Sequence, residues 1–167
     1  MLKFVCPLVL VDDIVASRYF YEQLLGQKIK FDFGQNVTFE GDFAIHLKSH
    51  FQSLLGDVTQ YSVIKKAHNG ELYFETDEIE SIHQRLKQAG VEFIHEIQEQ
   101  PWGQGVMRLY DPDGHIVEIG EFMETVVWRF HTQGLSIDSI SEKSSMRREF
   151  VEHVIQEHNE PGQASGG

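Results

Sequence analysis

The stretch Tyr110–Glu121 reads YDPDGHIVEIGE and decides how the rest of the chain is interpreted. Its Asp-Pro-Asp-Gly segment is strong turn chemistry, because Pro112 presets φ and Gly114 tolerates a positive φ. The carboxylates of Asp111 and Asp113 can accept hydrogen bonds from nearby backbone N–H groups. The sequence therefore predicts a tight turn here.

The residues directly after the turn, His115–Glu121, are rich in β-branched side chains and predict a strand. Strand side chains alternate between two faces, so Glu118 points away from the face of Val117 and Ile119. A carboxylate between β-branched neighbours needs solvent, a polar partner or a metal ion. Glu118 is therefore the first candidate functional residue.

Composition narrows the class of protein. The chain has 167 residues, 41% of them hydrophobic, and a formal net charge of −12. That charge argues against binding to nucleic acid or to an anionic membrane surface, and no stretch is long enough for a transmembrane helix. A single cysteine, Cys6, excludes an internal disulfide framework and is typical of a reducing compartment. We expect a cytoplasmic protein with neither a nucleic-acid nor a membrane partner.

The first part of the chain predicts a β-α-β-β-β unit. An apolar run, Phe4–Val11, predicts a buried strand, with Pro7 favouring an edge position. Asp12-Asp13 then precedes a helix that Gly26 ends. The helix is expected over Ile14–Leu25, and three strands over Gln27–Phe33, Asn36–Glu40 and Phe43–Lys48.

The same order returns after a connector, residues 49–69. A strand is expected over Glu71–Thr76, a helix over Ile79–Ala89, and further strands over Val91–Gln98, Gly105–Tyr110 and His115–Glu121. The segments VDDI (Val11–Ile14) and TDEI (Thr76–Ile79) occupy matching places. The sequence thus predicts an α+β fold of paired βαβββ modules, about 2–48 and 70–122, forming a half-barrel of mixed sheet.

The sequence predicts a helical extension over residues 123–160, with two short helices around Lys143–Ser145. It predicts a flexible tail over Pro161–Gly167. The two helices resemble a helix–turn–helix, but the acidic residues that follow Arg147 and Arg148 would repel phosphates. We expect these helices to cover the sheet or to mediate contacts with a partner.

When the two modules are aligned on VDDI and TDEI, Cys6 and Glu71 occupy equivalent positions. Each lies seven residues before the second acidic residue of its segment. When the last strands are aligned on Gly41 and Gly114, Glu118 is equivalent to Ile45. If the first module has one extra residue in its turn, Glu118 is equivalent to His46 instead. Two modules packed edge to edge would form a half-barrel in which the first and last strands of each contribute side chains to the inner face. The candidate inward set is Cys6, His46, Glu71 and Glu118.

The order of elements, with SRYFYEQLLG (Ser17–Gly26) and PWGQGVMRLYDPDGHIVEIGE (Pro101–Glu121), resembles the vicinal oxygen chelate superfamily of glyoxalase I, bleomycin-resistance proteins and extradiol dioxygenases. The resemblance covers about Leu2–Phe122. It implies a cavity on the concave face of the sheet and one divalent metal held by first and last strands. Glu118 and Glu71 match two of these ligand positions. In the first module, Cys6 and His46 depart from the usual ligands, but would still suit zinc or iron.

The resemblance implies a metal-dependent lyase or isomerase in which zinc, nickel, iron or manganese polarises vicinal oxygens and Glu118 moves a proton. Trp102, Arg108, Phe39 and Tyr73 are the candidate substrate-binding residues. If Ile45 faces the cavity instead of His46, a metal-free protein that sequesters a drug or metabolite is the alternative. A ligand-responsive regulator read out through the C-terminal helices is a third alternative. The sequence allows a homodimer and leaves open whether the cavity closes within one chain or across two chains.

Overall fold

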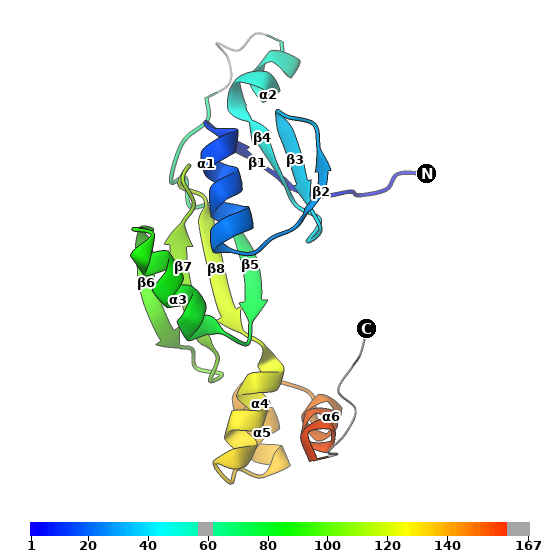
Figure 1. Ribbon diagram of the computed structural model, residues 1–167. Helices are drawn as coiled ribbons and strands as arrows, with labels where there is room; N and C mark the ends of the chain where they lie inside the picture. The colour runs from blue at the N-terminus through cyan, green and yellow to red at the C-terminus, as the bar shows by residue number, and fades with distance from the viewer. Residues whose placement is uncertain (57–61, 160–167) are drawn as a thin grey trace.

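The structure is a computed structural model that describes residues 1–56 and 62–159. It contains two four-stranded mixed sheets, ordered β1-β4-β3-β2 and β5-β8-β7-β6 (Figure 1). The first sheet is built from β1 (Leu8–Val11), β2 (Ile29–Asp32), β3 (Asn36–Phe39) and β4 (Ala44–Leu47). The second is built from β5 (Glu71–Thr76), β6 (Phe93–Glu99), β7 (Gly105–Tyr110) and β8 (Ile116–Glu121). In each sheet the first strand pairs parallel with the last, and the other pairs are antiparallel. The predicted pair of βαβββ modules is confirmed.

Each module carries one helix after its first strand. In the first module α1 (Ile14–Arg18) continues as a π-helical segment η1 (Tyr19–Leu24), and in the second the helix is α3 (Ile79–Gln88). Asp13 caps α1 by accepting hydrogen bonds from two backbone N–H groups of the first turn. Both helices end before a glycine with positive φ, as the sequence predicts.

A single hydrophobic core spans both modules, between the helices and one face of each sheet. Its buried members from the first module include Val11, Phe20, Tyr21, Leu24, Val37, Phe39, Phe43 and Ile45, and those from the second include Ile79, Leu86, Met107, Leu109, Val117 and Ile119. The strand members alternate in sequence, so the opposite face of each sheet is left for other side chains.

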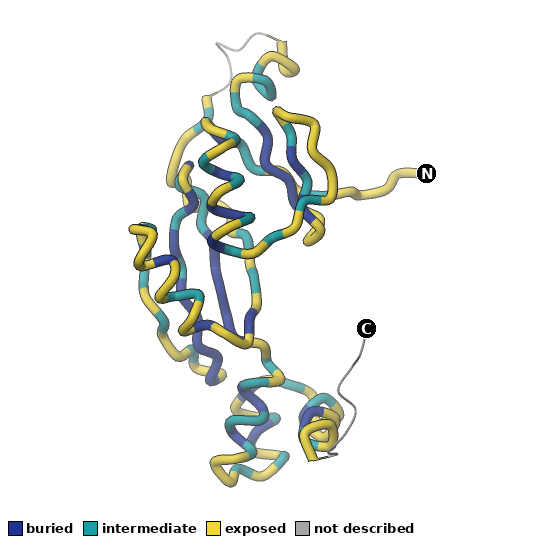
Figure 2. Tube along the Cα trace, in the orientation of Figure 1, coloured by how far each residue is buried: buried dark blue, intermediate teal, exposed yellow. Residues whose placement is uncertain are grey.

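The start of the chain corrects one prediction. Only Leu8–Val11 of the expected strand Phe4–Val11 is paired, and Phe4 and Val5 are 80% and 70% exposed. The ladder starts where Ala44 donates its N–H to the carbonyl of Pro7, and β4 extends no further to pair the earlier residues. Met1–Cys6 therefore projects from the body as an arm (Figures 1 and 2), and its exposed apolar side chains are Met1, Leu2, Phe4 and Val5.

The remaining helices lie outside the two modules. The connector contains α2 (Lys48–Leu54), and the extension contains α4 (Met123–Thr132), α5 (Ile137–Ser144) and α6 (Arg148–Asn159), which share a second, smaller hydrophobic core. The two expected helices around Lys143–Ser145 are α5 and α6, separated where Ser145 adopts a left-handed φ of 60°. The predicted tail falls outside the described residues. Within the described ranges, none of the helices has the length and apolar character needed to cross a membrane.

The modules are joined by the turn between β7 and β8. Asp111 is 4% exposed and accepts hydrogen bonds from the backbone N–H groups of Asp113 and His115, which confirms the predicted turn chemistry. Its other oxygen accepts a hydrogen bond of 2.9 Å from the hydroxyl of Tyr21, a fully buried residue of η1. Burial and the adjacent carboxylate raise the pKa of Tyr21 well above its ordinary value, so its hydroxyl remains a donor.

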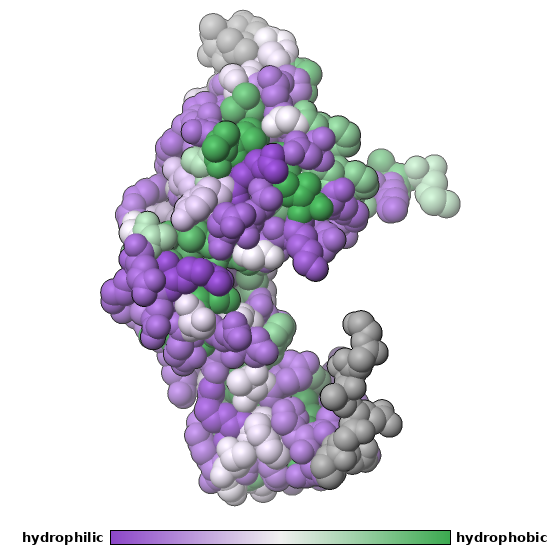
Figure 3. All heavy atoms as spheres, viewed as in Figure 1, coloured by the Kyte–Doolittle hydropathy of each residue, from purple (hydrophilic) through white to green (hydrophobic). Residues whose placement is uncertain are grey.

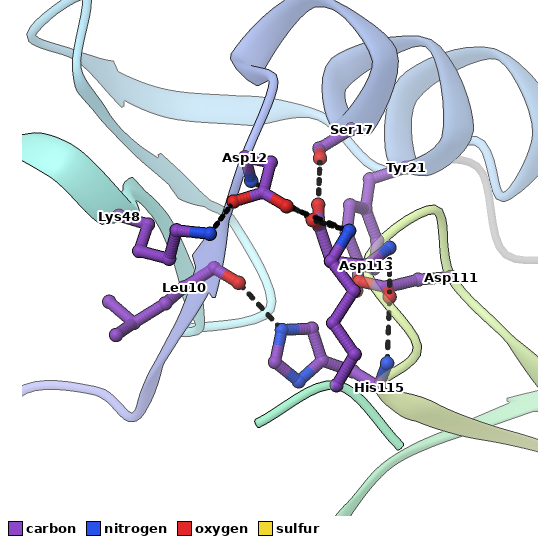
Figure 4. Close-up of polar contacts among 9 residues, drawn as sticks. Leu10, Asp12, Ser17, Tyr21, Lys48, Asp111, Asp113 and His115 are labelled. Carbon is purple, nitrogen blue, oxygen red and sulfur yellow. Dashed lines mark hydrogen bonds and ion pairs between the residues drawn. The ribbon is translucent and has the colours of Figure 1, made fainter. Parts of the chain in front are cut away.

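The second carboxylate of the turn reaches the same module (Figure 4). Asp113 accepts hydrogen bonds from the backbone N–H of Asp12 at 3.0 Å and from the hydroxyl of Ser17 at 3.4 Å. Lys48 and Lys65 bind the carboxylate of Asp12 and lower its pKa to about 2. The turn is therefore both the hairpin of the second module and its anchor on the first.

We predict that Tyr21→Phe destabilises the protein by about 1–3 kcal/mol, because it leaves a buried carboxylate oxygen of Asp111 without its donor. The matched control is Tyr19→Phe, two residues earlier and 57% exposed, which we expect to change stability by less than about 0.5 kcal/mol. Urea unfolding of both variants measures the difference. Equal midpoints for the two variants would contradict this role of the turn.

Candidate functional site

The second sheet has one face that the core does not cover, which we call the open face. Strand pairing places Tyr73 of β5 and Arg108 of β7 on either side of Glu118 of β8. Paired residues in neighbouring strands share a face, so these three side chains project together from the sheet. Glu71 lies two residues before Tyr73 and therefore shares this face.

Arg108 is the centre of the charged group on the open face. Its guanidinium binds Glu118 through Nη2 and Glu71 through Nε at 3.2 Å. Its Nη1 lies 3.3 Å from Nε2 of His95, whose Nδ1 is 2.9 Å from the carbonyl of Glu96. This pairing assigns the proton of His95 to Nδ1, because Nε2 must accept from the guanidinium. One cation thus bridges two carboxylates and a histidine.

Glu118 is the least exposed carboxylate of this group, at 8%. Burial raises the pKa of Glu118 above its ordinary value; the positive charge of Arg108 opposes that change and the nearby carboxylate of Glu71 reinforces it. Its Oε2 has the guanidinium beside it but no well-oriented hydrogen-bond donor within the described residues. A buried carboxyl with a raised pKa beside a cation is typical of groups that exchange protons at functional sites.

A chain of neutral hydrogen bonds borders the charged group. The indole N–H of Trp102 donates to Gln104 at 2.9 Å, the amide of Gln104 donates to the hydroxyl of Tyr73 at 2.8 Å, and Tyr73 donates to Glu75 at 2.8 Å. Burial and the bond to Glu75 raise the pKa of Tyr73 to about 12, so the phenol stays protonated. Gly120 makes room for this chain, because a Cβ there would lie 2.7 Å from the Gln104 amide nitrogen.

The first module does not bring its expected residues to this group. Ile45 is fully buried in the core, which leaves His46 on the opposite face of β4. His46 is covered by α2, where its Nε2 lies 2.8 Å from Nδ1 of His50, and burial followed by the charge of His50 lowers its pKa. Phe39 is fully buried and stacks on Phe43 within the core, away from the open face.

The four expected metal ligands are therefore separated. Cys6 belongs to the arm before β1, His46 lies beneath α2, and only Glu71 and Glu118 meet. In the part of the chain that the structure describes, no group of three or more His, Cys, Asp or Glu side chains is arranged to hold a metal ion. With Arg108 already between the two carboxylates, this donor set does not fit a metal centre.

Two members of the site that lie on or beside β6 and β7 were not predicted from the sequence. His95 and Gln104 lie on or beside strands that flank Arg108 and Tyr73. Their places depend on the pairing of β6 with β7, which contains register shifts near His95 that no sequence pattern indicates.

Comparison with known proteins agrees with this architecture. The family described as "Glyoxalase-like domain" matches residues 4–124, which include both modules and the whole open face. The chain belongs to the glyoxalase-like domain family. No protein of curated function matches this glyoxalase-like chain significantly.

Solved structures resemble the glyoxalase-like part of the chain. A protein of unknown function from Agrobacterium tumefaciens str. C58 is 40% identical, with a TM-score of 0.64 over 72% of this chain and 94% of that one. A glyoxalase/bleomycin resistance protein/dioxygenase superfamily member from Sphaerobacter thermophilus is 23% identical, with a TM-score of 0.54 over 72% and 98%. A lactoylglutathione lyase from Agrobacterium tumefaciens is 21% identical, with a TM-score of 0.53 over 72% and 94%. The last two likenesses show the fold alone.

We predict that the stability contributed by Glu118 falls as pH rises. Well below its ordinary pKa, the carboxyl of Glu118 is protonated in both the folded and the unfolded chain. Above its raised folded pKa, the carboxyl is ionised in both states, and the folded state alone bears the cost of burying the charge. The unfolding free energy of the wild type minus that of Glu118→Gln should therefore decrease through this window. Urea unfolding of both proteins at a series of pH values measures this difference. A difference that is constant or increases with pH would contradict the raised pKa.

Proposed function

We propose that this glyoxalase-like protein binds a small organic molecule with adjacent oxygen atoms on the open face, where Glu118 moves a proton. The observation that carries the proposal is a buried carboxyl with a raised pKa on a sheet face that is otherwise accessible. The neighbouring Tyr73 is 49% exposed and Trp102 is 37% exposed, so aromatic surface is available beside it.

Arg108 supplies the polar part of the proposed site. A guanidinium has five N–H donors, and the contacts of Arg108 with described residues engage three of them. The other two are available for neighbouring oxygens of a ligand. Glu118 as carboxylate would take a proton from the carbon next to a carbonyl, and the electron pair of that C–H bond would move to form an enediolate. The guanidinium would stabilise its negative oxygen while a proton passes from the neighbouring hydroxyl to that oxygen. Return of the carbon-bound proton from Glu118 to the other carbon would then complete an isomerisation.

The metal-dependent lyase or isomerase expected from the family resemblance stays a prediction, and so do the homodimer and the cytoplasmic location. The superfamily commonly uses divalent metals, but the donor set around Arg108 does not favour one here. The apolar arm Met1–Cys6 supports a dimer, because its exposed side chains would be buried most readily against a second chain.

Proton exchange tests the proposed function. In D₂O, wild-type protein should accelerate deuterium incorporation at the carbon next to the carbonyl in a panel of small α-hydroxyketones, observed by proton NMR. Glu118→Gln should lose this acceleration by about 10²–10⁴-fold, which is the usual contribution of a general base. The matched control is Glu99→Gln, an exposed carboxylate of β6 in the same sheet, outside both the charged group and the hydrogen-bond chain. Equal rates for wild type and Glu118→Gln would overturn the role of Glu118.

Measurement of the bound metal distinguishes the metal-free proton transfer proposed here from a metal-dependent lyase or isomerase. We expect untagged protein, purified without chelator, to hold far less than stoichiometric zinc, nickel, iron or manganese by inductively coupled plasma mass spectrometry, because Arg108 already balances Glu71 and Glu118. Stoichiometric metal that disappears in Glu118→Ala would instead support the metal-dependent lyase or isomerase.

A further inference from the structure

A second cavity lies away from the open face, where the two modules meet on the helix side. It has a volume of about 510 Å³, within the range of pockets that hold small organic ligands. Its walls come from α1 and η1, from the turn between α3 and β6, from the β7–β8 turn, and from Lys65 and Lys66 of the connector. None of Glu71, Arg108 and Glu118 lines it. Figure 3 shows hydrophobic atoms (green) at the surface between the regions of α1 and α3.

The floor of this cavity is apolar and is contributed by both modules. It includes Ala16, Phe20 and Leu24 from the first module and Ala89 and Val91 from the second. These residues are held in place because the β7–β8 turn anchors one module to the other through buried hydrogen bonds (Figure 4). The cavity is therefore a preformed site rather than a gap between loosely associated parts.

The rim of the cavity carries two lysines, Lys65 and Lys66, and each is ion-paired with neighbouring carboxylates. Lys65 forms ion pairs with Asp12 and Asp113. The ammonium of Lys66 binds both carboxylate oxygens of Glu92 and lies 4.3 Å from the ring centroid of Tyr110. Each ammonium has three donors and uses two in these contacts, so each retains one for a ligand. Both side chains reach solvent, with exposures of 52% and 44%.

Three acidic residues line the cavity, and each is paired. Asp111 and Asp113 are 4% and 6% exposed, and their oxygens are engaged by Tyr21, Ser17, Lys65 and backbone N–H groups. Glu92 is more exposed and is bound by Lys66. The connector is pressed against this wall: a Cβ at Gly114, whose φ is +83°, would lie 3.1 Å from the backbone nitrogen of Lys66. The close approach holds Lys66 at the rim.

We propose that this cavity is a second binding site, which takes a planar aromatic molecule carrying one acidic group. The ring would lie on the floor formed by Phe20, Leu24 and Val91, and the acidic group would accept hydrogen bonds from Lys65 and Lys66. The aromatic part matches the apolar floor, and the single charge matches the two remaining ammonium donors. The site does not depend on the function proposed for the open face.

The probes for this proposal are 2-naphthoate and 2-naphthol, which share the ring system and differ in the acidic group. In ¹H–¹⁵N NMR titrations of the full chain, 2-naphthoate should shift the amides of Ala16, Gly90 and Gly114 and saturate at submillimolar concentration. We expect 2-naphthol to bind at least fivefold more weakly. Lys66→Gln should reduce the preference for 2-naphthoate to about twofold or less.

Ala16→Met should weaken 2-naphthoate binding at least tenfold, because the longer side chain fills the floor. The matched control is Val15→Met, the preceding residue of α1, which is 76% exposed and does not line the cavity. Urea unfolding of both variants confirms that they are folded. Equal affinity in wild type and Ala16→Met, or shifts confined to the amides of the open face, would overturn the second site. Equal affinity for the two probes would overturn its acidic specificity.

Discussion

The burial of two carboxylates in the β7–β8 turn constrains the rest of the structure. A buried carboxylate must be fully hydrogen-bonded, and the donors for Asp111 and Asp113 come partly from their own turn and partly from α1, η1 and the end of β1. Separating the modules would leave both carboxylates short of donors. The same turn fixes the first residue of β8, so the position of Glu118 relative to Arg108 follows from the anchor between the modules.

Alternation along β8 then divides the strand between two tasks. Val117 and Ile119 complete the shared core, and Glu118 between them faces the other way. The last strand of the first module has the same division, with Ile45 in the core and His46 opposite. The modules differ in what covers that opposite face: α2 closes it over His46, whereas Tyr73 and Trp102 remain partly exposed beside Glu118.

Local chemistry made most of the fold predictable from sequence. The turn, the glycines that end the helices and the repeat of VDDI in TDEI all depend on neighbouring residues. Part of the site was predictable as well, because counting outward from the turn pairs Arg108 with Glu118.

The remainder of the site depends on tertiary structure. The place of His95 depends on irregular strand pairing. Phe39 is apolar and aromatic, which suits a ligand pocket and a core equally, and its face was decided by the packing of Tyr21 and Phe43. The alignment of modules paired Cys6 with Glu71, but a sequence alignment cannot show that the segment before Pro7 has no strand to pair with.

Charge balance links the open face to the chemistry proposed for it. Two carboxylates that share a half-buried surface require a cation, and here the cation is covalently attached to the neighbouring strand. A guanidinium differs from a metal ion because its N–H donors are directional. Its planar group can donate hydrogen bonds to two adjacent oxygens, whereas a metal ion would be coordinated by those oxygens. Because burial outweighs the guanidinium's effect on Glu118, the carboxyl retains a raised pKa beside a positive charge. In the proposed site, one residue therefore orients the oxygens while its partner stays able to exchange a proton.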